Sequence, residues 1–209
     1  FNLRLAALAK KAGIPVLYYI SPQIWAWKKG RIKKIKRIVD HMAVILPFEA
    51  ALYEQEGIPV TFVGHPLLDM VQVAVSRDVA VAELGLHPDK PVVGLFPGSR
   101  KSEIARMLPV LVEAARRIRR DHLDVQFVLP VASTLSEAEI TPFLGELQPA
   151  VKLTHGAIHT VMRACDAIAS VSGTVTLEIA LVGTPQVIMY RLASMTYAVA
   201  KRLVKVPFI

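Results

Sequence analysis

The fold is decided by residues 170–190, SVSGTVTLEIALVGTPQVIMY. A short apolar run that ends at Ala169 predicts a buried strand, and the small residues after it predict a turn. Residues 175–182 have helix-forming character, and a Gly-Thr-Pro sequence ends this helix before a second strand at 186–190. The expected apolar face of the helix consists of Leu177, Ala180 and Leu181. Strand, turn, helix and strand together predict one unit of a parallel α/β sheet.

The turn in this stretch is a candidate anion site. Ser172, Gly173 and Thr174 precede a helix whose first N–H groups and macrodipole favour an anion, and glycine lets a phosphate approach closely. Glu178 follows about one helical turn later, where its carboxylate would accept hydrogen bonds from the two vicinal hydroxyls of a ribose. The sequence therefore predicts a nucleoside diphosphate site, and the alternative is an ordinary βαβ unit with a Ser/Thr N-cap and a solvated glutamate.

The composition is that of a globular protein with one large or two smaller domains. Hydrophobic residues make up 53% of the 209 residues, and no apolar run approaches the ~20 residues of a membrane span. The single cysteine, Cys165, excludes an internal disulfide, and its apolar neighbours predict a buried thiol. The chain has no signal-peptide pattern. It opens at Phe1 and stops at Ile209 in mid-pattern, as we expect of an internal fragment of a longer protein.

Much of the formal charge of +8 lies in one segment, residues 28–37, which holds seven cations. Ile32 and Ile35 within it, and Val39 just after it, recur at helical spacing, so the segment predicts an amphipathic helix. With two tryptophans just before it, a membrane surface is favoured over nucleic acid, for which no recognition motif is present. A plain solvated helix face remains the alternative. The candidate residues for membrane or acceptor contact are Trp25, Trp27, Lys28, Lys33, Lys34, Lys36 and Arg37.

Helical and strand patterns alternate along the chain and predict parallel sheets with helices on both faces. The strands are expected at residues 15–20, 41–46, 60–63, 92–96, 125–129, 151–153, 166–169 and 186–190, and the helices at 2–12, 28–39, 48–56, 102–120, 136–147, 158–164, 175–182 and 194–204. Residues 64–66, Gly-His-Pro, interrupt the pattern, and residues 67–77 predict a short helix plus linker. This interruption predicts two domains, residues 1–65 and 66–209.

A second candidate anion turn, Pro97-Gly98-Ser99-Arg100, follows the strand at 92–96. The planar guanidinium of Arg100 suits phosphate oxygens, and Glu103 would either orient Arg100 or cap the following helix. The spacing of its glycine matches neither a P-loop nor a dinucleotide fingerprint. Two such turns at the carboxyl ends of strands in one sheet support each other, because ligands of open α/β sheets bind there.

A metal site is not expected. His155 and His159 are spaced at i, i+4, as in zinc-binding helices, but Gly156 lies between them. The sequence offers no carboxylate base and no obvious third ligand beside them. We therefore expect neither a metal nor another cofactor.

Four segments resemble the lipid-A-disaccharide synthase family over nearly the whole chain. They are residues 21–69, SPQIWAWKKGRIKKIKRIVDHMAVILPFEAALYEQEGIPVTFVGHPLLD, residues 95–104, LFPGSRKSEI, residues 172–191, SGTVTLEIALVGTPQVIMYR, and residues 200–209, AKRLVKVPFI. The resemblance implies a GT-B glycosyltransferase with two Rossmann-like domains, the active site lying in the cleft between them. It implies transfer from UDP-2,3-diacylglucosamine to 2,3-diacylglucosamine 1-phosphate (lipid X), with release of UDP and formation of a β-1,6 disaccharide. It further implies a cytoplasmic enzyme, peripheral on the anionic inner membrane of Gram-negative bacteria, that needs no metal.

The resemblance also assigns roles to residues of the donor site. Arg100 would hold the diphosphate, with Ser99 and Glu103 beside it, and Glu178 would bind the ribose. The other expected UDP-binding residues are Ser172, Gly173 and Thr174 at the phosphates and Met189, Tyr190 and Arg191 at the uracil. The family has an Asp-x-Pro-Asp segment before the position of Phe1, and an aspartate there is the expected base of an inverting transfer. These 209 residues alone are therefore expected to bind UDP without turnover.

Three questions stay open at this level. Another UDP-GlcNAc-using GT-B enzyme, either a MurG-type transferase or an epimerase, is the alternative activity. A non-catalytic membrane-surface binder of sugar nucleotides is the alternative from another class. The oligomeric state, a homodimer among the choices, does not follow from the sequence.

Overall fold

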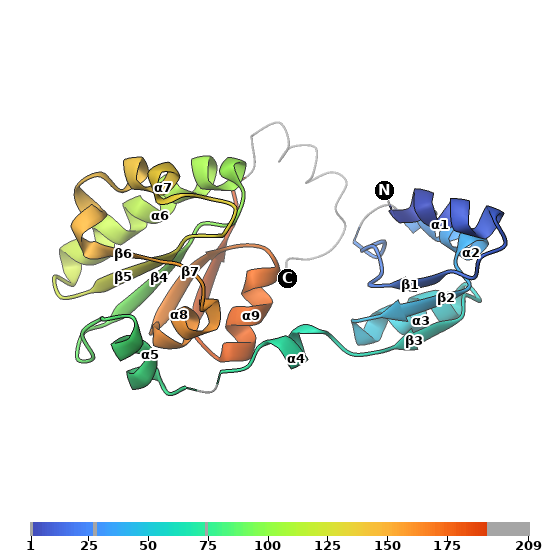
Figure 1. Cartoon of the computed structure of the whole chain (residues 1–209), viewed down its shortest axis with the longest axis horizontal. Helices are drawn as coiled ribbons and strands as arrows, with labels where there is room; N and C mark the ends of the chain where they lie inside the picture. Colours follow the sequence, from blue (N-terminus) through green and yellow to red (C-terminus); the bar gives the residue numbers. More distant parts are fainter. Residues whose placement is uncertain (1, 27–28, 74, 192–209) are drawn as a thin grey trace. The chain divides into compact units, whose positions relative to one another are not determined.

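The structure, a computed structural model, describes residues 2–26, 29–73 and 75–191 (Figure 1). These residues divide into two compact units, 2–68 and 69–191. The division lies within the short helix α4 (Leu67–Met70), whereas the sequence placed it between residues 65 and 66. Trp27, Lys28 and the helix expected at 194–204 lie outside the described residues.

Unit 1 contains a parallel sheet with strand order β1-β2-β3. Its elements are α1 (Asn2–Lys11), β1 (Leu17–Tyr19), the 3-10 helix η1 (Lys29–Arg31), α2 (Ile32–Ile38), β2 (His41–Val44), α3 (Pro47–Gln55) and β3 (Val60–Phe62). In the register, Tyr18 pairs with Met42 and Ala43 pairs with Thr61. The core of the unit joins the central strand to helices α2 and α3 through the fully buried side chains of Met42, Ile35 and Tyr53.

Unit 2 contains a five-stranded parallel sheet with strand order β6-β5-β4-β7-β8. Its elements are α5 (Arg77–Glu83), β4 (Val92–Phe96), α6 (Lys101–Asp121), β5 (Gln126–Pro130), α7 (Glu137–Leu144), the 3-10 helix η2 (Gly145–Ala150), β6 (Val151–Thr154), α8 (Ile158–Ala164), β7 (Ala167–Val171), α9 (Thr174–Val182) and β8 (Gln186–Met189). The chain adds strands on one side of β4 and then returns to add β7 and β8 on the other side. The direction of strand order therefore reverses between β4 and β7.

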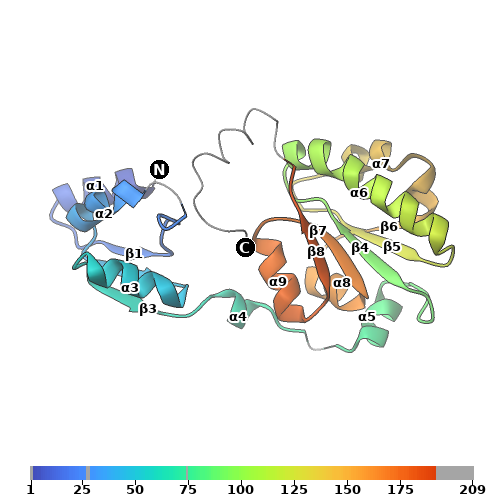
Figure 2. The ribbon, with the colours of Figure 1, turned by 180° about the vertical axis from the view of Figure 1, so that it is seen from behind.

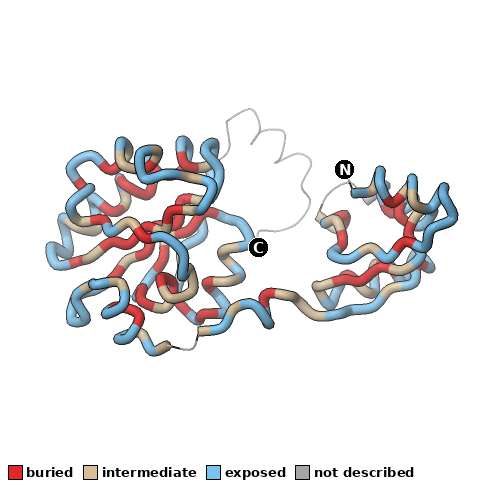
Figure 3. The backbone as a smooth tube through the Cα atoms, viewed as in Figure 1, coloured by how far each residue is buried: buried red, intermediate tan, exposed pale blue. Residues whose placement is uncertain are grey.

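Helices cover both faces of this sheet (Figures 1 and 2). On one face α6 and α7 pack through Leu108 and Ile140 onto Phe127, and all three side chains are fully buried. On the other face α5, α8 and α9 pack onto the sheet, with Val161 of α8 and Ile179 of α9 fully buried. The buried positions accordingly follow the strands in Figure 3, while the outer sides of the helices are exposed. The predicted α/β class with parallel sheets is confirmed.

The expected and observed elements differ mainly in two segments, around helix α5 and at the end of helix α7. The sequence assigned residues 67–77 to one short helix and a linker, and it missed helix α5, which begins after the N-cap Ser76. The Ser76 hydroxyl accepts a hydrogen bond from the N–H of Val79 at 3.4 Å, so an N-cap signal was present. The helix expected at 136–147 ends at Leu144 because Gly145 adopts φ +53° and the chain continues as a 3-10 helix.

The predicted apolar face of α9 is wrong. Leu177 and Leu181 are 48% and 44% exposed, whereas Ile179 and Val182 are buried at 0% and 7%. Apart from Glu178, every residue from 177 to 182 is apolar. The period of the helix therefore did not identify which side the sheet would cover.

In each unit, an aspartate that immediately precedes a strand joins three elements. In unit 2, Asp166 accepts two hydrogen bonds from the Arg77 guanidinium, at 2.9 and 2.8 Å, and one from the N–H of Val92 at 2.8 Å. In unit 1, Asp40 accepts from the N–H of Val16 at 2.8 Å and pairs with Lys10. The aspartates thus fix the start of one strand against its neighbour and against a helix or its flanking turn.

Helix α6 begins with a cap that requires a glycine. The Glu103 carboxylate accepts hydrogen bonds from the N–H groups of Ser99, at 3.0 Å, and Arg100, at 3.3 Å. Gly98 has φ +99°, and a Cβ there would lie 2.4 Å from the Glu103 Oε2 atom. Only glycine therefore lets the carboxylate reach the two N–H groups.

We predict that Asp166→Asn lowers the free energy of unfolding of unit 2 by about 1–2 kcal/mol, because the charged acceptor of Arg77 is lost at a partly exposed site. Asp78→Asn is the control, since Asp78 lies 3.9 Å from the same arginine and is 86% exposed. Urea denaturation measures both variants. An equal loss in the two variants would contradict the role of Asp166.

The same pair predicts a pH dependence. Burial acts to raise the pKa of Asp166, but the hydrogen bonds from Arg77 and Val92 outweigh it and hold the pKa below its ordinary value of 3.8. A carboxylate with a lowered pKa stabilises the fold above its ordinary pKa and loses this effect as the pH falls through the folded-state value. The stability difference between wild type and Asp166→Asn should therefore shrink below pH 3.8 in acid titrations of unfolding.

We predict that Gly98→Ala destabilises unit 2 by about 1–3 kcal/mol, because alanine is strained at a positive φ and its Cβ displaces the Glu103 carboxylate. Gly173→Ala is the matched control from the other turn, since its φ is 171° and a Cβ there meets no atom within 4 Å. Thermal unfolding compares them. Equal stability of the two variants would show that the cap does not depend on glycine.

Candidate functional site

A pocket of about 590 Å³ lies within unit 2, where β4 and β7 end side by side. The two strands pair in parallel, so the turns that follow them open at the same edge of the sheet. This is also the point at which the strand order reverses, the position where open α/β sheets bind ligands. The lining residues are Phe96, Pro97, Gly98, Ser99, Arg100, Glu103, Pro130, Val131, Ala132, Ser133, Gly156, Ile158, Val171, Ser172, Gly173, Thr174, Val175 and Glu178.

The pocket brings together seven of the ten residues predicted to bind UDP. They are Ser99, Arg100, Glu103, Ser172, Gly173, Thr174 and Glu178. The other three, Met189, Tyr190 and Arg191, follow at the end of β8 and are not among the lining residues. The carbonyl of Met189 instead accepts the N–H of Ser172 at 3.0 Å, and this bond links the end of β8 to the turn. Contact of this strand end with a uracil stays a prediction.

Helix α9 presents open N–H groups to the pocket. Its N-cap is Gly173, which has no side chain to cap the helix. Within the described part of the chain, no carbonyl or side chain accepts from the N–H groups of Thr174 and Val175, both of which line the pocket. The first N–H groups of a helix have no partner inside the helix and carry its positive dipole end. The start of α9 therefore favours binding of an anion.

The start of α6 differs, because a carboxylate of the chain already occupies it. The Glu103 carboxylate accepts hydrogen bonds from the N–H groups of Ser99 and Arg100 and a further one from the Arg100 guanidinium at 2.6 Å. Burial acts to raise the pKa of Glu103, but these hydrogen bonds outweigh it and lower the pKa. The Arg100 side chain is 77% exposed, so its remaining donors are accessible to a ligand. Both roles considered for Glu103, orienting Arg100 and capping the helix, occur together.

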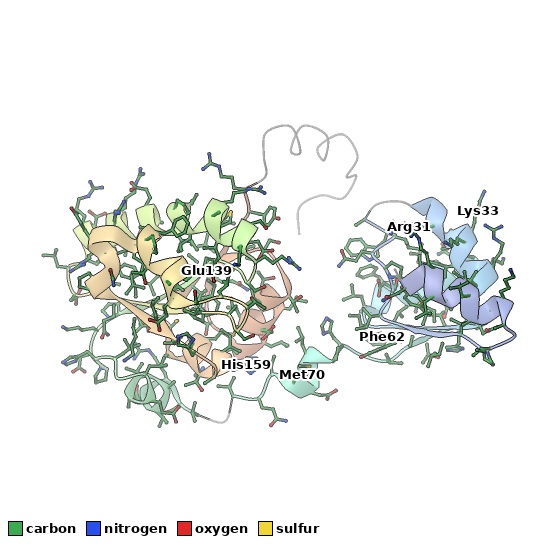
Figure 4. The ribbon with its side chains drawn as sticks, turned by 45° about the horizontal axis from the view of Figure 1, so that its top comes forward. Arg31, Lys33, Phe62, Met70, Glu139 and His159 are labelled. Atoms are coloured by element: carbon green, nitrogen blue, oxygen red, sulfur yellow. The ribbon has the colours of Figure 1, made fainter. Side chains whose placement is uncertain are left out.

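Contacts at the rim tie the loop after β5 to the start of α6. The Thr134 hydroxyl donates to the carbonyl of Ser99 at 2.7 Å, and Lys101 pairs with Glu139 of α7 at 2.7 Å. Hydrogen bonds from Lys101 and Ser136 lower the pKa of Glu139, labelled in Figure 4, to about 2. These contacts were not expected from the sequence, although Ser-x-x-Glu at 136–139 has the spacing of a capping box.

Each of the two histidines considered as zinc ligands pairs with a different glutamate. His155 Nε2 lies 2.7 Å from Glu137 Oε1, and His159 Nε2 lies 3.0 Å from Glu178 Oε2. Among the described residues, no three His, Cys, Asp or Glu side chains gather where they could hold a metal ion. The pair of His159 and Glu178 was not foreseen, because it joins α8 to α9 across a gap of 19 positions.

The basic segment of unit 1 has the predicted amphipathic form. Ile32, Ile35 and Val39 are buried, whereas Lys33 projects outward from α2 (Figure 4). Lys34, Lys36 and Arg37 are exposed as well. Just before this segment, Trp25 donates to Glu49 at 3.2 Å and packs edge-on against Phe48 with ring centroids 5.2 Å apart.

Two further properties bear on the function. Cys165 is buried, and desolvation raises its pKa to about 12, so it remains a packed thiol as predicted. In the part of the chain that the structure describes, no helix is both long enough and apolar enough to cross a membrane.

Solved structures show what fold the chain has. The S. aureus MnaA–UDP co-structure matches with a TM-score of 0.64 at 15% identity, covering 96% of this chain and 58% of that one. The UDP-GlcNAc 2-epimerase of Neisseria meningitidis bound to UDP-GlcNAc matches with a TM-score of 0.60 at 14% identity, covering 95% and 59%. At such identities the likeness concerns the fold alone, and it agrees with the predicted GT-B class.

Sequence comparison gives much closer relatives. Lipid-A-disaccharide synthase of Trichlorobacter lovleyi is 60% identical over all of this chain and 55% of the relative. The enzyme of the same name from Geobacter metallireducens is 54% identical over all of this chain and 54% of the relative. The chain thus spans about half the length of the curated relatives that it matches. The family model described as lipid-A-disaccharide synthetase matches residues 1–209, and the chain therefore belongs to the lipid-A-disaccharide synthetase family.

Proposed function

We propose that the protein takes part in lipid A biosynthesis as a glycosyltransferase. It transfers 2,3-diacylglucosamine from its UDP derivative to 2,3-diacylglucosamine 1-phosphate, forming a β-1,6 disaccharide and releasing UDP. Family membership supports the reaction. The observation that supports donor binding in this chain is the pocket at the β4–β7 switch point, which joins an open helix N-terminus, Arg100 and Glu178.

In this proposal the donor lies along the two turns. The diphosphate accepts hydrogen bonds from the N–H groups of Thr174 and Val175 and from the exposed guanidinium of Arg100. Glu178 accepts from the ribose hydroxyls, and the strand end at 189–191 lies against the uracil. As the glycosidic bond breaks, negative charge grows on the leaving UDP, and the helix end and Arg100 stabilise it. We propose that the reaction needs no metal, because Arg100 and the start of α9 can neutralise the leaving diphosphate, and the UDP-sugar itself is a substrate and not a cofactor.

Transfer with inversion requires a base on the acceptor side, and the described residues of the donor pocket offer none in a suitable role. The acceptor and the acyl chains are proposed to approach unit 1, whose exposed cations suit an anionic lipid surface. The protein would then work at the cytoplasmic face of the inner membrane, as a peripheral protein.

The alternative activities give different products. An epimerase would convert UDP-GlcNAc into its 2-epimer, whereas a transferase would release UDP only with an acceptor present. A non-catalytic surface binder would produce neither. Mass spectrometry of reactions of the full-length protein with UDP-GlcNAc, and with UDP-diacylglucosamine plus lipid X, distinguishes all three, whereas these 209 residues alone are expected to bind UDP without turnover. Appearance of the 2-epimer in place of the disaccharide would refute the proposed function.

We predict that Glu178→Ala weakens UDP binding roughly tenfold or more, since hydrogen bonds from a ligand hydroxyl to a carboxylate contribute about 1.5–3 kcal/mol. Binding of 2′,3′-dideoxy-UDP should be nearly equal in wild type and variant. Isothermal titration calorimetry measures both ligands. Glu137→Ala is the matched control, because Glu137 also pairs with a histidine but does not line the pocket. Equal loss for the two ligands would show that Glu178 is structural.

We predict that replacing Lys33, Lys34, Lys36 and Arg37 by Gln releases the protein from anionic vesicles, since each cation near the surface contributes about 1 kcal/mol. The control removes the same charge elsewhere, by replacing Arg116, Arg117, Arg119 and Arg120 of α6 by Gln. Vesicle sedimentation at low and high salt measures the partitioning. Equal release by both variants would mean that net charge, and not α2, governs the binding.

A further inference from the structure

Glu178 lines the pocket, so the conformation of its side chain affects how a ligand can bind there. It is the fifth residue of α9, and 21% of its side chain is exposed. A glutamate side chain has three rotatable bonds, and holding it in one rotamer costs conformational entropy. Unless the free protein already holds this side chain in place, a ligand that binds to it must supply that cost.

Within the described residues, His159 is the one side chain that hydrogen-bonds to the Glu178 carboxylate, with Nε2 3.0 Å from Oε2. A carboxylate only accepts hydrogen bonds, so Nε2 of the imidazole is the donor. His159, labelled in Figure 4, is itself only 25% exposed and lies on α8, which packs against α9. The bond leaves Oε1 and a lone pair of Oε2 for a ligand.

We propose that His159 is a positioning residue for the donor: it holds Glu178 in the rotamer that accepts the two vicinal hydroxyls of a ribose. The inference rests on the proposed function, because it assigns the ribose to Glu178. It adds a determinant of specificity for ribonucleotides that lies outside the set of pocket-lining residues. His159 does not touch the ligand; it acts through Glu178 alone.

The elements that carry His159 and Glu178 favour a role of this pair at the pocket over a role only in packing. Helix α8 follows β6, at the edge of the sheet, while α9 follows β7, on the other side of β4. The chain turns into α8 through Gly156 and Ala157, with φ +65° and +41°. Gly156 and Ile158 line the pocket, and His159, the next residue, contacts Glu178. His155, four positions earlier, pairs with an exposed glutamate of α7 instead.

The test compares His159→Ala, His159→Gln and the control His155→Ala by calorimetric titration with UDP and with 2′,3′-dideoxy-UDP. We expect His159→Ala to weaken UDP about tenfold and dideoxy-UDP less than twofold, because the lost order concerns only the hydroxyl contacts. His159→Gln should recover part of the UDP affinity, since its amide N–H also donates to a carboxylate. His155→Ala should leave both ligands unaffected.

Thermal unfolding of each variant shows whether a loss of affinity is caused by a loss of the fold. If His159→Ala weakens both ligands equally, or if neither changes, the pair is a structural link between α8 and α9 and the inference is wrong. Should His159→Ala unfold, His159→Gln decides the question through the same ratio of UDP to dideoxy-UDP affinity. Failure of the wild-type protein to bind UDP would refute the proposed function instead.

Discussion

The parallel pairing of β4 with β7 is the constraint on which the pocket of unit 2 depends. It places Phe96 opposite Ser170, so that the two following turns open at one edge. A glycine makes the packing around this pair possible, because a Cβ at Gly94 would lie 2.8 Å from Phe96 and 2.9 Å from both Cys165 and Ile168. Any side chain at Gly94 would therefore displace these three side chains and disturb the packing around the β4–β7 pair.

The two turns are similar in sequence type but complementary in electrostatics. At α6 the chain supplies its own anion, Glu103. The Arg100 guanidinium donates one hydrogen bond to this carboxylate, and its side chain is otherwise exposed to solvent. At α9 the N-cap is a glycine and the N–H groups remain open. One turn thus offers a fixed dipole and the other an oriented side chain, a combination that suits the two phosphates of a diphosphate without filling the pocket.

Contacts between elements that are distant in sequence hold unit 2 together. Asp166 ties the start of β7 to β4 and to Arg77, at the opposite ends of these strands from the pocket. At the pocket, Thr134 ties the loop after β5 to Ser99, and His159 of α8 pairs with Glu178 of α9. Each of these bonds is modest in free energy, and the two at the pocket restrict the motion of groups that a ligand must find in place.

The sequence by itself determined the alternation of strands and helices, the parallel sheets and the two glycine turns, because these follow from local periodicity and turn chemistry. It did not determine which face of α9 is buried, since nearly every residue from 177 to 182 is apolar and only the sheet selects Ile179 and Val182. It considered His159 only as a zinc ligand and rejected that role, and it found no partner for this residue, because spacing along one helix carries no information about α9. Only the tertiary structure decided that partner, since strand order β6-β5-β4-β7 sets which helices meet.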